Sequence, residues 1–211
     1  MPKLGRLIGD LRTLSWWGRF AQLQLGLLTF GVGVSLLIES HIGLDPWSCF
    51  HLGTSMQTGL SFGRVVQSVG LMLIIVSWAG LRQRPGVGTV FNMLVIGPWV
   101  DLFRAQPWYP SSDGGTAGVL QFLVGLALIG LASGLYIGAR LGAGPRDSFV
   151  LGLSQRLGRS IRVTRIALEV AVLCIGWLFG GPVGLGTILF ALLMGPLMQL
   201  SLRVFRYQPT S

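Results

Sequence analysis

The sequence predicts an all-α polytopic membrane protein, in which six transmembrane helices form two inverted three-helix repeats, each with a short helix that does not span the bilayer. Composition, a series of long apolar segments and an internal repeat support this prediction. Of the 211 residues, 51% are hydrophobic and only 11% are charged, and the mean hydropathy is +0.67. Soluble domains carry about 25% charged residues, so most of this chain is expected to lie in lipid.

Several classes of function are excluded by what the sequence contains. The two cysteines, Cys49 and Cys174, lie far apart in apolar surroundings and cannot form a disulfide framework or a Cys/His metal site. We recognise no catalytic triad, metalloprotease motif, phosphate-binding loop or dinucleotide fingerprint. We therefore expect a protein that is not an enzyme and that has no metal and no cofactor.

The apolar segments define the predicted spans. Six segments are long enough to cross a bilayer or nearly so: residues 20–38, 62–81, 89–104, 119–139, 161–179 and 187–204. Two further segments, 46–58 and 145–157, are each 13 residues long. Such a helix is about 20 Å long, which is too short to cross about 30 Å of hydrocarbon.

The two short segments carry helix-start and helix-end residues at matching positions. Asp45 is a good N-cap for a helix that begins with Pro46, and Gly144 precedes Pro145 in the same way. Glycines 59 and 158 fit the left-handed residue that ends a helix, and serines 61 and 160 fit N-caps of the next spans. Either these helices point their N-termini into a protein-lined cavity, where they would attract an anion, or they lie flat in the interface.

The charges predict the orientation. With both termini cytoplasmic, six spans place 14 of the 16 Lys and Arg residues on the cytoplasmic side, as the positive-inside rule requires. The net charge of +9 then reflects topology, so we do not expect nucleic-acid binding. The predicted organisation is a cytoplasmic segment, repeat 1, a periplasmic linker, repeat 2 and a cytoplasmic tail, at residues 1–19, 20–105, 106–118, 119–204 and 205–211.

The second half of the chain repeats the first. Residues 43–46 align with 142–145 at an offset of 99, and residues 86–89 align with 184–187 at an offset of 98. Because each unit has an odd number of spans, the second copy enters the membrane from the opposite side. Inverted repeats are typical of secondary transporters, with the substrate site between the repeats.

Polar and helix-breaking residues in the apolar part are the candidate site. Arg162, Arg165 and Glu169 share one stripe of the fifth predicted span, where Arg165 and Glu169 can form an (i, i+4) ion pair. With Arg146 and Asp147 they leave one unbalanced positive charge, so we expect these five to meet around an anionic group. The full predicted set comprises Asp45, Pro46, Trp47, Ser48, Asn92, Asp101, Pro145, Arg146, Asp147, Arg162, Arg165, Glu169, Thr187 and Gln199, with helix kinks at Pro98 and Pro196.

Two further patterns concern packing and protonation. Small residues at Gly31 and Ser35 match Gly130 and Gly134, which predicts close packing of the first and fourth spans, within one chain or in a homodimer. His41 and His51 are expected on the outer side, where a lone interfacial histidine is usually hydrated.

The motifs together resemble a known family. They are the segments 43–47, 59–63, 84–89, 142–147 and 184–187, combined with Asn92, Gly97, Asp101, Arg162, Arg165, Glu169, Gly195, Pro196 and Gln199. This set resembles the YczE-like branch of the YczE/YyaS/YitT family of bacterial integral membrane proteins. The sequence departs from the family pattern Gly-Pro-Trp-Asp, since Asp45 replaces the glycine and Ser48 the aspartate. The resemblance implies a multi-pass protein of the inner membrane rather than a particular reaction.

Two functions are compatible with these observations. The first is a small secondary transporter, embedded in the lipid bilayer, that moves a small polar or anionic metabolite at the interface of the repeats. The alternative is a membrane scaffold or accessory protein whose Arg-rich cytoplasmic loop binds a partner or anionic lipid. Protein polar groups lining a cavity at mid-depth favour the first, and a tightly packed repeat interface favours the second.

Overall fold

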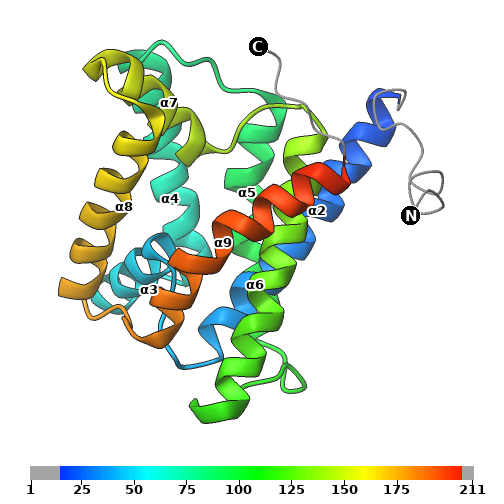
Figure 1. Cartoon of the computed structure of the whole chain (residues 1–211), viewed down its shortest axis with the longest axis vertical. Helices are drawn as coiled ribbons and strands as arrows, with labels where there is room; N and C mark the ends of the chain where they lie inside the picture. Colours follow the sequence, from blue (N-terminus) through cyan, green and yellow to red (C-terminus); the bar gives the residue numbers. More distant parts are fainter. Residues whose placement is uncertain (1–14, 206–211) are drawn as a thin grey trace.

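The computed structural model describes residues 15–205, and every regular element in that range is helical (Figure 1). The outer parts of the predicted cytoplasmic segments, residues 1–14 and 206–211, lie outside the described residues. In chain order the helices are α2 (Trp16–Ile38), α3 (Pro46–Thr58), α4 (Phe62–Ile75), α5 (Val87–Arg104), α6 (Gly115–Gly138), α7 (Pro145–Leu157), α8 (Ile161–Leu178) and α9 (Leu185–Val204). A π-helical turn, η2 (Val76–Gly80), extends α4.

Four helices in the described part of the chain are long and apolar enough to cross a membrane. They are α2, α4 together with η2, α6 and α9. The other two predicted spans, α5 and α8, form helices of 18 residues each. Helix α8 carries Arg162, Arg165 and Glu169, which lower its apolar character. Four of the described helices are therefore candidate membrane spans, and six spans remain a prediction.

The short helices have the predicted bounds. In α3 the side chain of Asp45 accepts a hydrogen bond from the backbone nitrogen of Ser48 at 3.2 Å, and Pro46 is the first helical residue. In α7, Gly144 precedes Pro145 in the same position. Both helices end at a glycine with positive φ, Gly59 at 70° and Gly158 at 62°. The cap residues thus confirm where each short helix begins and ends.

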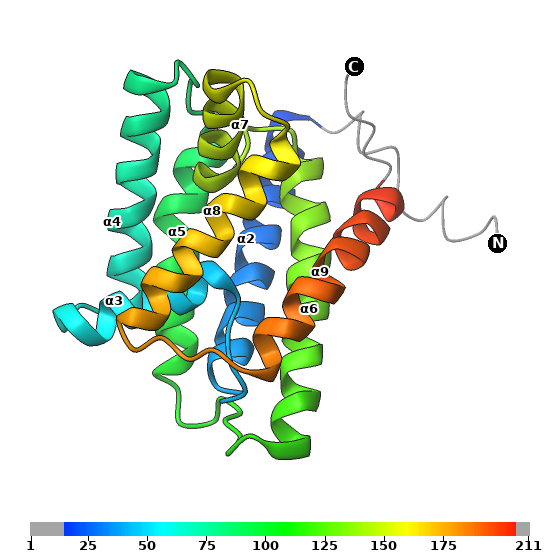
Figure 2. The ribbon, with the colours of Figure 1, turned by 60° about the vertical axis from the view of Figure 1, so that its left-hand side comes forward.

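The long helices alternate in direction. Helices α2, α5 and α8 run from the end of the molecule where α7 lies toward the end where α3 lies, and α4, α6 and α9 run the opposite way (Figures 1 and 2). Helices α2 and α6 pack along each other at the centre, and fully buried side chains such as Leu23, Leu27, Phe122 and Leu126 form the core there. The two short helices consequently lie at opposite ends of the bundle.

The glycines of the central pair do not all face where the sequence suggested. Gly33 packs against α6, where an added Cβ would lie 2.7 Å from Ile129. Gly31 instead faces Trp99 of α5, and Gly130 faces Leu197 of α9. The prediction that the first and fourth spans pack closely is confirmed. Gly31 and Gly130, however, allow close approach of α5 to α2 and of α9 to α6. They are used within the chain, and a homodimer stays a prediction.

A loop of the first half binds the start of a helix in the second half. The residues before α3 run along the N-terminus of α9, where the Gly186 nitrogen donates to the Ile42 carbonyl at 2.8 Å. The Thr187 hydroxyl donates to the Leu44 carbonyl at 2.8 Å and accepts from the Gly184 nitrogen at 3.2 Å. The hydroxyl of Thr187 thus closes the first turn of α9 onto the other half.

The equivalent loop of the second half makes the same contacts in return. The Gly88 nitrogen donates to the Leu141 carbonyl at 2.7 Å, and the Thr89 hydroxyl donates to the Ala143 carbonyl at 2.5 Å. Thr89 also accepts from the Gly86 nitrogen at 3.1 Å. Each half therefore contacts the other through an equivalent set of hydrogen bonds. One set lies at the α3 end of the bundle, and the other lies at the α7 end (Figure 2).

An ion pair joins two helices at the α3 end. Arg104, in the last turn of α5, lies 2.6 Å from the carboxylate of Glu39, which caps the end of α2. Burial raises the pKa of Glu39, but hydrogen bonds from Arg104 and Ser111 outweigh it and hold the pKa below its usual value. Glu39 is thus charged at neutral pH and helps to fix α2 against α5.

We expect removal of the Thr89 hydroxyl to destabilise the fold. Thr89→Val keeps the shape of the side chain but leaves the Ala143 carbonyl and the Gly86 nitrogen without this partner. Each unpaired buried group costs about 1–3 kcal/mol, so the thermal unfolding midpoint in detergent should fall clearly. Thr89→Ser, which retains the hydroxyl, is the control and should unfold close to the wild type. Equal midpoints for the valine and serine variants would contradict the bonded role of the hydroxyl.

Candidate functional site

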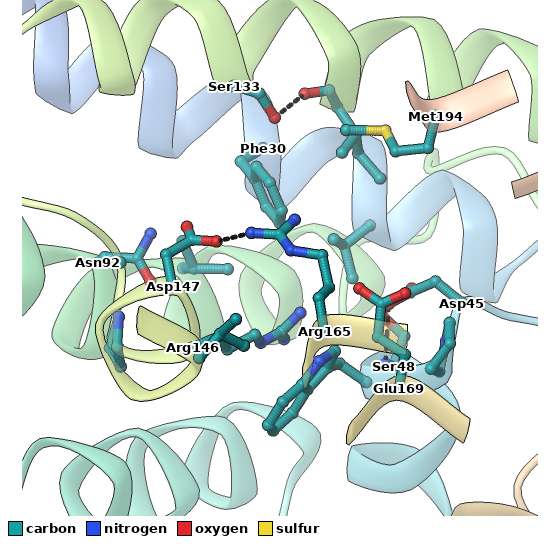
Figure 3. Close-up of a pocket in the computed structure, with 18 of the residues that line it drawn as sticks. Phe30, Asp45, Ser48, Asn92, Ser133, Arg146, Asp147, Arg165, Glu169 and Met194 are labelled. Carbon is teal, nitrogen blue, oxygen red and sulfur yellow. Dashed lines mark hydrogen bonds and ion pairs between the residues drawn. The ribbon is translucent and has the colours of Figure 1, made fainter. Parts of the chain in front are cut away.

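A cavity of about 1030 Å³ lies between the two halves of the chain (Figure 3). Side chains from both short helices and from the six long helices line it. Eleven of the fourteen predicted site residues are among them: Asp45, Pro46, Trp47, Ser48, Asn92, Pro145, Arg146, Asp147, Arg165, Glu169 and Thr187. The structure therefore brings most of the polar residues of the apolar part of the chain into one place.

The short helices meet at this cavity through their N-termini. Trp47 and Arg146 are the second residues of α3 and α7 and occupy equivalent positions in the repeat. The guanidinium carbon of Arg146 lies 4.8 Å from the centroid of the Trp47 ring, in a cation–π contact. Of the two arrangements left open by the sequence, N-termini that face a cavity agree with the structure.

The two helix starts differ in how they are capped. In α3 the Asp45 carboxylate already accepts the Ser48 N–H, so a negative side chain occupies that N-terminus. In α7 the N-cap is Gly144, which offers no side chain, and its backbone lies at the cavity wall. Asp45, which stands where the family pattern has glycine, thus places a buried carboxylate directly beside the cavity.

Asp147 is held by two other helices. Its carboxylate lies 2.5 Å from Arg165 of α8, and the Tyr136 hydroxyl of α6 donates to it at 3.1 Å. The predicted local pair between Arg165 and Glu169 is wrong, because α7 folds back over α8 after Gly158 and brings Asp147 within reach of Arg165. The ion pair therefore joins two elements rather than two turns of one helix.

Arg146 and Glu169 are the charged groups of the cavity that keep free bonding capacity. Within residues 15–205, neither side chain forms a hydrogen bond or an ion pair, although Arg146 contacts Trp47. Asp45 and Glu169 interact electrostatically, and Figure 3 shows their carboxylates turned toward each other. The cavity thus presents a guanidinium on one side and two neighbouring carboxylates on another.

The charge balance of the site differs from the prediction. Among the described residues, three arginines and three acids line the cavity: Arg140, Arg146, Arg165, Asp45, Asp147 and Glu169. Arg162 does not take part, because it lies on the exposed face of α8. The expected surplus of one positive charge is therefore wrong, since Asp45 from the first half adds a third carboxylate. A ligand with both charges fits this set better than a simple anion.

Five predicted residues lie outside the cavity. Arg162 and Gln199 are exposed, and Asp101 instead accepts the Gly63 N–H at 2.9 Å, which holds α4 on α5. Pro98 and Pro196 lie inside α5 and α9, which continue through them as unbroken helices. Helical spacing along the chain could place these residues at the depth of the cavity, but it could not predict the rotation of each helix, which turns them away from the cavity.

Other cavity residues were missed or misplaced by the sequence analysis. His51 was expected on the outer side, but its side chain is only 2% exposed and lines the cavity. Burial, and then the nearby charge of Arg146, lower the pKa of His51 well below its usual value, so the ring is neutral at pH 7. Its spacing of four residues from Trp47 was the available signal. Tyr136, Phe30, Ser133 and Met194 carried no such signal.

The long apolar helices and the charged cavity between them define a helical membrane protein with an internal polar site. A family model described as "Family of unknown function (DUF6198)" matches residues 17–203, and the chain belongs to this family. Together with the relatives YczE and YyaS described next, this match confirms the resemblance to the YczE-like branch.

The chain is similar to proteins of two bacteria. It is 35% identical over 190 residues to the "Uncharacterized membrane protein YczE" of Bacillus subtilis (strain 168), covering 90% of this chain and 86% of that protein. It is 33% identical over 202 residues to an "Uncharacterized protein" of Haemophilus influenzae (strain ATCC 51907 / DSM 11121 / KW20 / Rd), covering 93% and 90%. A third relative, the "Uncharacterized protein YyaS" of Bacillus subtilis (strain 168), is 26% identical over 184 residues, covering 86% and 90%. No solved structure matches the chain.

Proposed function

We propose that the protein is a small secondary transporter of the bacterial inner membrane, built from two inverted three-helix repeats. The alternating helix directions support this, because they place α3 and α7 at opposite ends of the bundle (Figure 2). The reciprocal bonds of Thr89 and Thr187 also support it, since equivalent loops exchange the same contacts. Six spans with both termini cytoplasmic follow from this arrangement.

The proposed cargo is a small polar metabolite that carries a carboxylate or phosphate and a cationic group. The observation that carries the proposal is the cavity in which Arg146 and Glu169 keep free bonding capacity at the junction of the halves. The guanidinium can bind a carboxylate or phosphate in a bidentate manner, and the carboxylates of Asp45 and Glu169 can bind a cationic group. The guanidinium of Arg146 is only partly exposed and has no hydrogen-bond or ion-pair partner among the described residues, which is costly unless it is compensated and so favours an occupied state.

Purified protein in liposomes tests this proposal. Uptake of radiolabelled amino acids and amine-bearing phosphate esters should identify at least one cargo that enters faster than in protein-free liposomes, whereas dicarboxylates, which lack the cationic group, should not. Arg146→Gln and Glu169→Gln should each reduce its uptake at least tenfold. Arg162→Gln is the matched control, because Arg162 lies on α8 outside the cavity, and it should transport like the wild type.

The same variants separate the transporter from a scaffold. Arg159 and Arg162 are exposed at the α7 end, where a partner or anionic lipid could reach them. A scaffold role predicts that Arg162→Gln weakens binding to vesicles that contain phosphatidylglycerol, whereas Arg146→Gln has no effect. Absence of uptake for amino acids and amine-bearing phosphate esters, with such a binding defect, would contradict the transporter proposal.

A further inference from the structure

The seam between α4 and α5 is closed by direct backbone contact. A Cβ added to Gly97 would lie 2.5 Å from the carbonyl oxygen of Gly63. The Gly63 nitrogen donates to Asp101, and a Cβ added to Gly70 would lie 2.8 Å from Met93. These glycines let the two helices touch over several turns.

The equivalent seam between α8 and α9 is open. Gly63 and Arg162 are both the second residue of their helix, so Arg162 stands where the first half has a glycine. Gly195 aligns with Gly97, yet a Cβ added to it would meet nothing within 4 Å. Helices α8 and α9 are joined by a loop at the α3 end and diverge toward the α7 end in the view of Figure 1.

The cavity reaches the surface through this open seam. Ile166 and Val170 of α8 line the cavity and are 53% and 56% exposed. Ala191 and Gly195 of α9 also line it and are exposed. Helix α9 is apolar enough to span a membrane, and in the six-span arrangement proposed above α8 also crosses the bilayer, so there this opening faces hydrocarbon rather than water.

The inner walls beside the opening are also apolar. Leu173 of α8 and Phe190, Met194 and Met198 of α9 also line the cavity, on the two helices that form the seam. A small water-soluble ligand gains nothing from such a wall or from an entrance in lipid, whereas a hydrocarbon chain gains about 0.8 kcal/mol per buried methylene group. The volume of about 1030 Å³ is also at the upper end of ordinary ligand sites.

We propose that the cargo is a single-chain amphiphile with a zwitterionic headgroup, which enters from the bilayer between α8 and α9. Its anionic group binds Arg146, its cationic group binds Glu169 and Asp45, and its chain lies along the apolar wall and leaves through the seam. This inference rests on the proposed function, in which the cavity is the substrate site. It keeps the oppositely charged groups proposed there but places them on the headgroup of an amphiphile instead of a small polar metabolite.

Photo-crosslinking in nanodiscs of the full chain tests the inference. The probe is a lysophosphatidylethanolamine with a diazirine in its chain, and crosslinked peptides are mapped by mass spectrometry. We expect labelling to concentrate on α8 and α9 around Ile166, Val170 and Gly195. Arg146→Gln and Gly195→Phe should each reduce it at least tenfold, because one removes the headgroup partner and the other fills the seam. Leu200→Phe, at an exposed position of α9 outside the cavity, is the matched control and should label fully.

Competitors identify which part of the probe is recognised. Unlabelled lysophosphatidylethanolamine should suppress labelling. Palmitate lacks the zwitterionic head, and glycerophosphoethanolamine lacks the chain, so each should need at least tenfold higher concentrations for the same suppression. Full labelling of Gly195→Phe, or equal competition by glycerophosphoethanolamine, would overturn the amphiphile inference. In that case Arg146-dependent uptake of a soluble zwitterion into liposomes would still uphold the proposed function. Labelling and uptake that are both unchanged in Arg146→Gln would defeat both.

Discussion

Gly43→Ala should prevent the protein from reaching a stable folded state. Gly43 has a φ of 106°, a region that alanine rarely adopts. An added Cβ would also overlap the backbone nitrogen of Gly184, and neither backbone can move without breaking the bonds around Thr187. Strain and overlap each cost about 1–3 kcal/mol, and their sum of about 2–6 kcal/mol can remove the stability of a protein at the low end of the usual range, about 5 kcal/mol. We expect little monodisperse protein after detergent extraction.

Gly59→Ala is the matched control for this prediction. Gly59 also has a positive φ, 70°, but an added Cβ would meet nothing within 4 Å. Only the strain of about 1–2 kcal/mol remains, so this variant should be extracted in normal yield with a modestly lower unfolding midpoint. Similar yields for Gly43→Ala and Gly59→Ala would show that the contact with Gly184 is not tight in the folded protein.

Cysteine labelling should give an all-or-none result for the inverted topology. Asp113 lies in the exposed segment before α6, at the α3 end, and Arg159 is exposed after α7, at the opposite end. In a background with Cys174→Ser, a membrane-impermeant maleimide should label Asp113→Cys in intact cells. It should label Arg159→Cys only after permeabilisation. Native Cys49 is buried and serves as an internal control for unfolding.

Each other outcome of the labelling has a defined meaning. Labelling of both positions from one side would mean that an even number of spans separates them, which would contradict the inverted repeats. Labelling of Arg159→Cys alone in intact cells would keep the repeats but reverse the orientation. The proposed cavity would remain in that case, with its α7 end facing outward.

The ends of the helices could be predicted because they depend on neighbours along the chain. Asp45 with Pro46, and the glycines at 59 and 158, fix the short helices by local hydrogen bonds and backbone preference. The predicted spans differ from the observed long helices by only a few residues for the same reason. The internal repeat then indicated which loops are equivalent, and the bonds of Thr89 and Thr187 agree with that alignment.

The partners of the charged residues could not be predicted, because they depend on how each helix is rotated and which helices touch. Arg165 had an acceptable partner one turn away in Glu169, yet it pairs with Asp147 from another helix. The predicted topology placed His51 on the outer side as an interfacial histidine, but the packing of α3 buries its ring. The difference between the closed α4–α5 seam and the open α8–α9 seam likewise could not be predicted. Gly63 and Arg162 stand at equivalent positions of α4 and α8, but the effect of the larger side chain is seen only when the two helices are compared in three dimensions.

The reciprocal loop contacts have a consequence for synthesis of the protein. Thr89 and Gly88 bond to carbonyls of Ala143 and Leu141, which leave the ribosome about fifty residues later. Until then these two donors at the start of α5 lack their native acceptors, although α5 can already pack on α2 and α4. The first half therefore cannot complete the start of its last helix alone, and translation of the loop after α6 supplies the missing acceptors.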